Sequence, residues 1–130
     1  MTTELMILGW ALVLALVQIA LAGALRTAET GLAYNMGPRD APAPQVRPVT
    51  ARVQRAQANL FETLPVFAVA VLIAHVAGRE GELTLWGSYA YIAARVLFVP
   101  LYAFGVPVLR SLVWGVSVAG IVMILVAILK

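Results

Sequence analysis

The chain of 130 residues is 62% apolar and only 12% charged, whereas soluble domains are nearer half apolar and a quarter charged. So few polar side chains cannot cover a soluble core, and we predict one membrane domain over residues 1–130. The chain has no cysteine, which excludes disulfides, and only one histidine, which argues against a bound metal. Its net charge of +3 is interpreted through the distribution of basic residues between the loops, and no nucleic-acid partner is expected.

Four apolar segments are long enough to span a bilayer. The first, Leu5–Leu25, is about 31 Å long at the rise of an α-helix, and its only polar residue is Gln18. A signal peptide is the competing interpretation, but Glu4 precedes the segment, no basic residue does, and the apolar run is too long. We predict helices at about 4–26, 50–77, 83–104 and 108–129, which make an all-α integral membrane four-helix bundle.

Features inside the predicted helices indicate how they pack. Pro65 and Pro100 fall within the second and third helices, where a membrane helix tolerates a proline with a kink. The connections on either side of the third helix are short, so consecutive helices should be antiparallel. Small residues that favour close packing occur in the fourth helix: Gly115, Ser117, Ala119 and Gly120. Three tryptophans are expected to act as interfacial anchors: Trp10, Trp86 and Trp114.

The long connection at about 27–49 determines the predicted orientation. It contains Pro38, Pro42, Pro44 and Pro48, which predict no regular helix after about Asn35. Basic residues are concentrated in or near this loop and in the third connection: Arg26, Arg39, Arg47, Arg52, Arg55 and Arg110. Because the other side holds only Arg79 and Lys130, the loop is expected in the cytoplasm and both termini on the non-cytoplasmic side.

Polar side chains form one stripe on each of two helices. The stripe on the second helix is Arg52, Arg55, Asn59 and Glu62; that on the third is Tyr91, Arg95, Phe98 and Tyr102. Glu62 and Arg95 lie about 22 and 18 Å from the outer ends of their helices, so both stripes should meet near the cytoplasmic side, where Arg26 and Arg110 also lie.

This predicted cluster suits an anionic ligand, because several guanidinium groups surround one carboxylate. A structural alternative remains open. In that alternative, Glu62 and Arg95 clamp the second and third helices together, while the loop arginines contact anionic lipid headgroups.

The segment from Arg52 to Phe67 carries the pattern R-A-x-x-N-x-x-E-x-x-P-x-F. This pattern resembles the second transmembrane helix of the MAPEG family, the membrane-associated proteins in eicosanoid and glutathione metabolism. Ala94-Arg95, Tyr102 seven residues after that arginine, and Leu109-Arg110-Ser111 also match, so the resemblance covers nearly the whole chain.

The resemblance implies a homotrimer that binds glutathione between subunits near the cytoplasmic face. The residues it assigns to glutathione are Arg26, Arg55, Asn59, Glu62, Arg95 and Tyr102, and Arg52 is added from the same stripe. Arg110, assisted by Ser111, is implied to activate the thiol. The chain departs from the family pattern at two positions. Thr63 stands where some members carry tyrosine, and Phe98 stands where well-studied enzymes of the family carry tyrosine or histidine.

Two functions follow as hypotheses. The first is a glutathione-dependent transferase or peroxidase acting on a lipophilic electrophile that arrives through the bilayer. The second is a non-catalytic membrane protein that uses the same polar residues for oligomer packing or for binding anionic lipid. A small multidrug antiporter is disfavoured, because such exporters carry a carboxylate in the first helix and Leu5–Leu25 has none.

Overall fold

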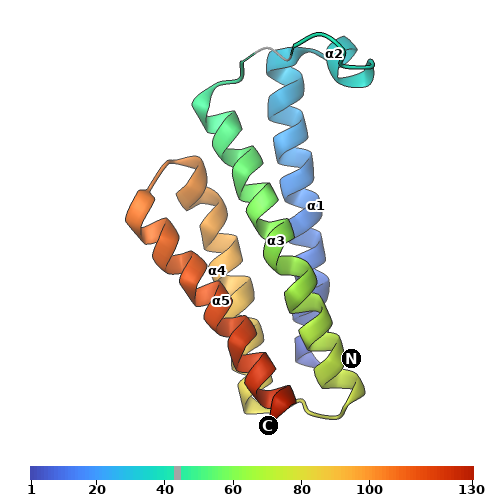
Figure 1. Cartoon of the computed structure of the whole chain (residues 1–130), viewed down its shortest axis with the longest axis vertical. Helices are drawn as coiled ribbons and strands as arrows, with labels where there is room; N and C mark the ends of the chain where they lie inside the picture. The colour runs from blue at the N-terminus through green and yellow to red at the C-terminus, as the bar shows by residue number, and fades with distance from the viewer. Residues whose placement is uncertain (43–44) are drawn as a thin grey trace.

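The computed structural model describes residues 1–42 and 45–130, so Pro44 lies outside the described residues. Its helices are α1 (Thr3–Thr30), α2 (Leu32–Met36), α3 (Pro48–Val76), α4 (Glu82–Ala103) and α5 (Pro107–Leu129). The long helices alternate in direction, and both termini lie at one end of the molecule, opposite α2 (Figure 1). The predicted all-α class and antiparallel order of consecutive long helices are confirmed.

Three helices, α1, α3 and α5, are long and apolar enough to cross a membrane. Helix α4 was predicted as a further span but is not among them, because polar side chains lower its hydropathy. Thr84, Ser88 and Arg95 of α4 are all buried inside the bundle, where they face protein. A fourth span through α4 stays a prediction.

The first helix and the loop that follows it differ from the prediction. Helix α1 continues to Thr30 and the short helix α2 follows, so the described chain has five helices where four were expected. Gly31 separates the two helices at a φ of 89°, which favours glycine. Asn35 Nδ2 donates to Thr27 Oγ1 (2.9 Å) and Thr30 Oγ1 donates to Asn35 Oδ1 (2.7 Å), so α2 is held against the end of α1.

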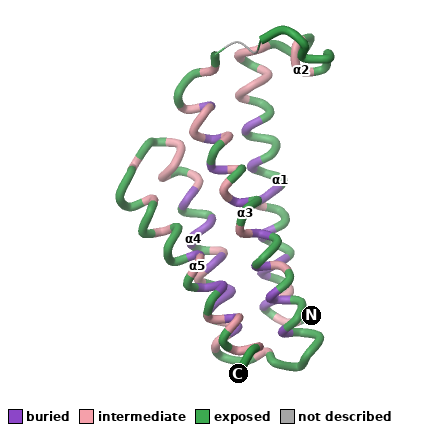
Figure 2. The backbone as a smooth tube through the Cα atoms, in the orientation of Figure 1, coloured by how far each residue is buried: buried purple, intermediate pink, exposed green. Residues whose placement is uncertain are grey.

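The core lies between the facing sides of the long helices, while exposed residues cover the outer sides (Figure 2). The rings of Phe67 in α3 and Tyr91 in α4 stack at 4.0 Å between centroids. The hydroxyl of Tyr91 is 2.9 Å from Thr63 Oγ1, within hydrogen-bond distance. Gln18 in α1 is 1% exposed, and neither of its amide atoms has a partner among the described residues.

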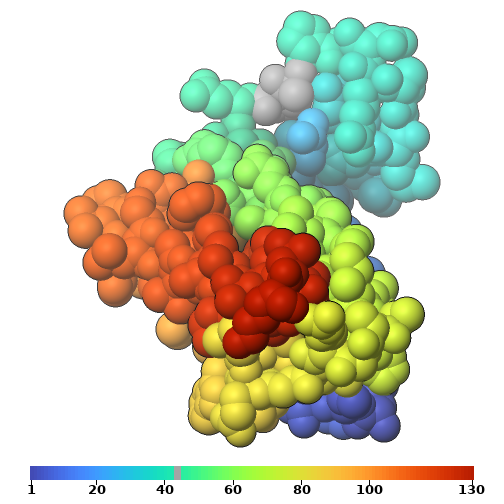
Figure 3. All heavy atoms as spheres, turned by 60° about the horizontal axis from the view of Figure 1, so that its bottom comes forward, coloured from blue at the N-terminus to red at the C-terminus, as the bar shows by residue number. Residues whose placement is uncertain are grey.

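Helices α4 and α5 approach each other through two glycines. A Cβ atom added at Gly87 would lie 2.6 Å from the carbonyl oxygen of Gly120, and one at Gly120 would lie 2.5 Å from that of Gly87. Gly120 and Ser117 are buried, so the predicted close packing is confirmed for these two, whereas Gly115 and Ala119 are exposed. In Figure 3 the red end of α5 lies against the yellow start of α4.

The end that holds both termini contains a polar network that the sequence did not predict. Glu4 is only 6% exposed and accepts a hydrogen bond from Thr84 Oγ1 (2.7 Å). Thr2 Oγ1 donates to Glu80 (2.7 Å), whose other carboxylate oxygen lies 3.2 Å from His75 Nδ1. This network links the start of α1 to α4 and to the α3–α4 turn.

Candidate functional site

Arginines of α3 contact the last turn of α4, at the end of the bundle opposite the termini. Arg52 Nε donates to the carbonyl oxygen of Ala103 (3.0 Å), and Arg55 Nε donates to the hydroxyl of Tyr102 (3.2 Å). A cation at a helix C-terminus is favourable, because the unpaired carbonyl groups there carry partial negative charge. These two contacts fix the distance between α3 and the end of α4.

Tyr102 is the centre of this arginine cluster. The guanidinium of Arg110, in the first turn of α5, lies 4.7 Å from the centroid of the Tyr102 ring, and that of Arg55 lies 5.7 Å from it. Both distances are within the range of cation–π attraction. One tyrosine therefore gathers cations from two helices.

The cluster surrounds a pocket of about 310 Å³. It is lined by Arg52, Arg55, Tyr102, Gly105, Pro107 and Arg110. Gly105 forms the α4–α5 turn at a φ of 72°, and a Cβ atom there would touch the Arg52 guanidinium at 3.5 Å. With three guanidinium groups and no carboxylate in its lining, the pocket is suited to an anion.

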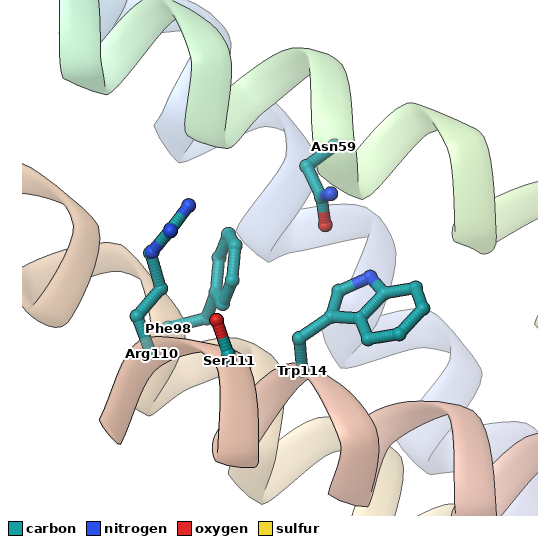
Figure 4. Close-up of a pocket in the computed structure, with 5 residues that line it drawn as sticks. All are labelled: Asn59, Phe98, Arg110, Ser111 and Trp114. Atoms are coloured by element: carbon teal, nitrogen blue, oxygen red, sulfur yellow. The ribbon is translucent and has the colours of Figure 1, made fainter. Parts of the chain in front are cut away.

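A second pocket, of about 160 Å³, shares Arg110 with the first. It is lined by Asn59, Phe98, Arg110, Ser111 and Trp114. Figure 4 shows the side chain of Asn59 pointing from α3 towards those of Ser111 and Trp114 on α5. The hydroxyl of Ser111 also donates to the Pro107 carbonyl oxygen one turn earlier (3.2 Å).

Arg95 supports the second pocket from inside the bundle. It is 1% exposed, and its Nη1 donates to Asn59 Oδ1 (2.8 Å). Its guanidinium lies 4.3 Å from the centroid of the Phe98 ring, and its Nε and Nη2 are buried without a partner among the described residues. Arg95 thus orients one lining residue and packs on another, although it lines neither pocket itself.

Two predicted site residues lie apart from these pockets. Glu62 is exposed on α3 and forms no ion pair within the described part of the chain, so the alternative in which it clamps Arg95 is wrong. Arg95 is held by Asn59 instead. Arg26 lies on α1, lines neither pocket, and has a buried Nε without a partner among the described residues.

The sequence interpretation missed Trp114 as a site residue. It predicted a membrane anchor, yet the indole lines the second pocket. The available signal was its spacing, because residues four and three positions after Arg110 and Ser111 share their helix face. Thr63, noted as a departure from the family pattern, bonds with Tyr91 one helical turn from Asn59.

A family model described as the MAPEG family matches residues 7–130, essentially the whole chain. Neither the curated proteins nor the solved structures gave a match. The chain, an all-helical membrane protein with arginine-lined pockets between its helices, therefore belongs to the MAPEG family, which includes glutathione-dependent enzymes.

Proposed function

We propose that the protein binds glutathione in the arginine-lined pocket and transfers it to, or uses it to reduce, a lipophilic electrophile. The observation that carries the proposal is that Arg52, Arg55 and Arg110 line one pocket with no carboxylate among them. Glutathione has two carboxylates, one ammonium and one thiol. Its carboxylates match guanidinium groups in charge and geometry.

Arg110 is proposed as the residue beside the sulfur, because it is the one residue common to the linings of both pockets. A guanidinium near a thiol stabilises the thiolate and lowers the pKa of the thiol, and the thiolate is the reactive form. In a transfer, the sulfur forms a bond to the electrophilic carbon and the leaving group departs with its electron pair. The thiol proton passes to water, and the hydroxyl oxygen of Ser111, whose proton is donated to the Pro107 carbonyl, can accept a hydrogen bond near the reacting atoms.

A homotrimer is proposed because a charged side chain faces outward from the single chain. Glu62 is exposed on α3, a helix apolar enough to span a membrane, where an unpaired charge is costly, and it forms no ion pair among the described residues. A neighbouring copy would cover Glu62 and bring it to the ammonium of bound glutathione. Arg26 would then contribute from the end of α1.

The proposed orientation places α2 and the arginine cluster in or near the cytoplasm, with both termini on the non-cytoplasmic side. The distribution of arginine and lysine supports this orientation. The end with α2 holds Arg39, Arg47, Arg52, Arg55 and Arg110, whereas the arginine and lysine side chains at the other end of the described chain are those of Arg79 and Lys130. Membrane lipids are partners in either orientation. The lipophilic substrate would reach the site through the bilayer.

A melting titration tests glutathione binding. A ligand that binds only the folded state raises stability by about 2.7 kcal/mol at a hundred times its Kd, so glutathione should raise the melting temperature of the detergent-solubilised protein. Arg55→Gln should abolish the rise, and Arg79→Gln, at the opposite end, should keep it. A wild-type melting temperature that glutathione leaves unchanged would remove the support for this function.

Turnover tests the role of Arg110. With glutathione and chlorodinitrobenzene, a generic aryl acceptor, the wild-type protein should release chloride at a measurable rate. Arg110→Ala should lose about 10²-fold or more of that rate, the size expected for removing a group that stabilises reacting charge. A variant that binds glutathione normally and retains the full rate would contradict this assignment.

A second candidate is a non-catalytic membrane protein whose polar residues serve oligomer packing or anionic-lipid binding. It is favoured by one observation: Arg52 and Arg55 are already bonded to the end of α4. In that case phosphatidylglycerol, and not glutathione, should raise the melting temperature. Glu62→Gln should weaken the oligomer measured by native mass spectrometry.

A further inference from the structure

We propose that the bundle contains an internal site for bound water, which bridges Gln18 of α1 and Arg95 of α4 on the arginine side of the apolar core. Both side chains are 1% exposed and carry polar atoms without a partner among the described residues. Water binding at this site requires neither glutathione nor turnover.

The apolar core has a definite end in each of the four long helices. Its last members towards the arginine cluster, one from each helix, are Ala15, Leu60, Tyr91 and Ile121. Buried apolar residues continue beyond this end but do not belong to the core cluster: Ala22, Val53, Ala56, Ala94 and Phe98. The apolar packing is therefore interrupted between the two groups.

Each long helix places a polar side chain directly beyond the end of the core. These side chains, called the polar layer, are Gln18, Asn59, Arg95 and Ser117. Gln18 follows Ala15 by about 4.5 Å, and Arg95 follows Tyr91 by about 6 Å. Because α1 and α4 run towards the arginine cluster while α3 and α5 run away from it, each member lies on the arginine side of the core (Figure 1).

The polar layer contains four buried atoms without a partner among the described residues: Nε2 and Oε1 of Gln18, and Nε and Nη2 of Arg95. A guanidinium stays charged inside a protein, and the printed contacts of Arg95 are with neutral groups, Asn59 Oδ1 and the Phe98 ring. A buried charge or amide is costly unless it is hydrogen-bonded. These four atoms therefore require partners.

The opposite end of the bundle shows the contrast. Glu4, Thr84 and Ser88 are also buried there, and all three are bonded to protein. Thr84 Oγ1 donates to Glu4 (2.7 Å), and Ser88 Oγ donates to the Thr84 carbonyl oxygen (2.7 Å). Direct bonds thus satisfy the buried polar groups near the termini, whereas the polar layer leaves its amide and guanidinium free to bind a ligand.

The mixture of donors and acceptors identifies the ligand as water. Gln18 Oε1 is an acceptor, while Gln18 Nε2 and the two arginine nitrogens are donors. A small anion would satisfy the donors and leave Gln18 Oε1 without a partner. Water both donates and accepts, and a buried water makes about three hydrogen bonds, so about two molecules are enough for the four atoms. Ser117 Oγ, which donates to the Trp114 carbonyl oxygen (2.6 Å), keeps lone pairs for a further bond.

Asn59 connects the polar layer with the smaller pocket. Its Oδ1 accepts from Arg95 Nη1 (2.8 Å), and its side chain lines the pocket of about 160 Å³. Water can exchange with the layer through this pocket. By bonding Nε and Nη2, it would hold the guanidinium plane in place and leave Nη1 directed at Asn59.

Gln18→Leu tests whether the amide is hydrogen-bonded. Leucine and glutamine have similar helix propensity and size, so the change mainly removes the amide. The melting temperature in nanodiscs should fall if water bonds the amide and rise if the amide is simply unpaired in an apolar core. Gln45→Leu, at an exposed position, should leave it unchanged. A rise for Gln18→Leu would overturn the proposal.

A double-mutant cycle tests the bridge to Arg95. Arg95→Met keeps a long side chain against Phe98 and removes the guanidinium, so Gln18→Leu should cost less in this background than in the wild type. The same fall of melting temperature in both backgrounds would overturn the bridge.

Nuclear magnetic resonance tests the site directly and decides the case in which Arg95→Met does not fold. In deuterated, ¹⁵N-labelled wild-type protein in nanodiscs, water should give cross-peaks to the Gln18 side-chain amide and to Arg95 Nε–H. The Gln18 signals are assigned by their loss in Gln18→Leu. The backbone N–H of Ala11, which is fully buried in the apolar core, is the control and should give none. Absence of the Gln18 or the Arg95 cross-peak would overturn the proposal.

Replacing chloride by gluconate at constant ionic strength distinguishes water from a bound anion. The melting temperatures of the wild type and Gln18→Leu should respond equally to the exchange, which includes any chloride bound at the exposed arginines. A stabilisation by chloride that Gln18→Leu loses would assign the site to an anion and overturn water as its ligand.

Discussion

Replacing Gly87 by alanine tests the close contact between α4 and α5. The added Cβ atom would lie 2.6 Å from the carbonyl oxygen of Gly120, whereas ordinary contact begins at 3.4 Å, so the two backbones must separate by about 0.8 Å. Overpacking of this kind costs about 1–3 kcal/mol. The higher helix propensity of alanine returns up to about 1 kcal/mol. We expect Gly87→Ala to lower the free energy of unfolding by a net value of up to about 2 kcal/mol.

Gly115→Ala is the control, because no atom lies within 4 Å of its added Cβ. Both variants gain the same helix propensity, so the difference between them isolates the packing cost of about 1–3 kcal/mol. Thermal unfolding followed by circular dichroism in detergent should rank Gly115→Ala at or above the wild type and Gly87→Ala several degrees below it. Equal melting temperatures for the two variants would refute the close packing of α4 on α5.

Two further substitutions test buried hydrogen bonds by the same unfolding assay. Tyr91→Phe removes the bond with Thr63 (2.9 Å) and keeps the aromatic stack, so stability should fall by about 1 kcal/mol; an unchanged melting temperature would show that the bond contributes nothing. Glu4→Ala removes the acceptor of Thr84 and should cost about 1.5–3 kcal/mol, whereas Glu4→Gln retains an acceptor and should cost less; the opposite order would contradict the buried contact.

The long helices could be predicted because their signals are local. Apolar runs of membrane-spanning length, interrupted by short glycine- and proline-containing connections, place the helices close to their observed bounds. Helix α2 could not be predicted in this way, since it depends on the bonds of Asn35 with Thr27 and Thr30. The burial of Glu4 was missed for a similar reason: an acid near a chain terminus is expected in water, and its partner Thr84 is distant in the sequence.

The site was predicted in part, because helical periodicity fixes which residues share a face. The predicted stripe on the second helix does supply residues to both pockets. Arg52 and Arg55 line the larger pocket at the end of α4, and Asn59 lines the smaller one. Glu62 is exposed, because it lies on the same outer edge of the stripe as the exposed Arg55, whereas Arg52 and Asn59 lie on the inner edge and are partly buried. The binding roles of these residues stay predictions.

The position of Arg110 depends on structure that no local pattern describes. It opens α5 directly after the Gly105 turn, and α5 is held against α4 at Gly120, about 15 Å further along the helix. A change in that contact would pivot the first turn of α5 relative to Tyr102, where the guanidinium now lies 4.7 Å from the ring. Two pockets converge on this one guanidinium, so a packing defect far from both would alter both together. The chemistry proposed for the site therefore requires a rigid α4–α5 pair, which small residues at the helix contact provide.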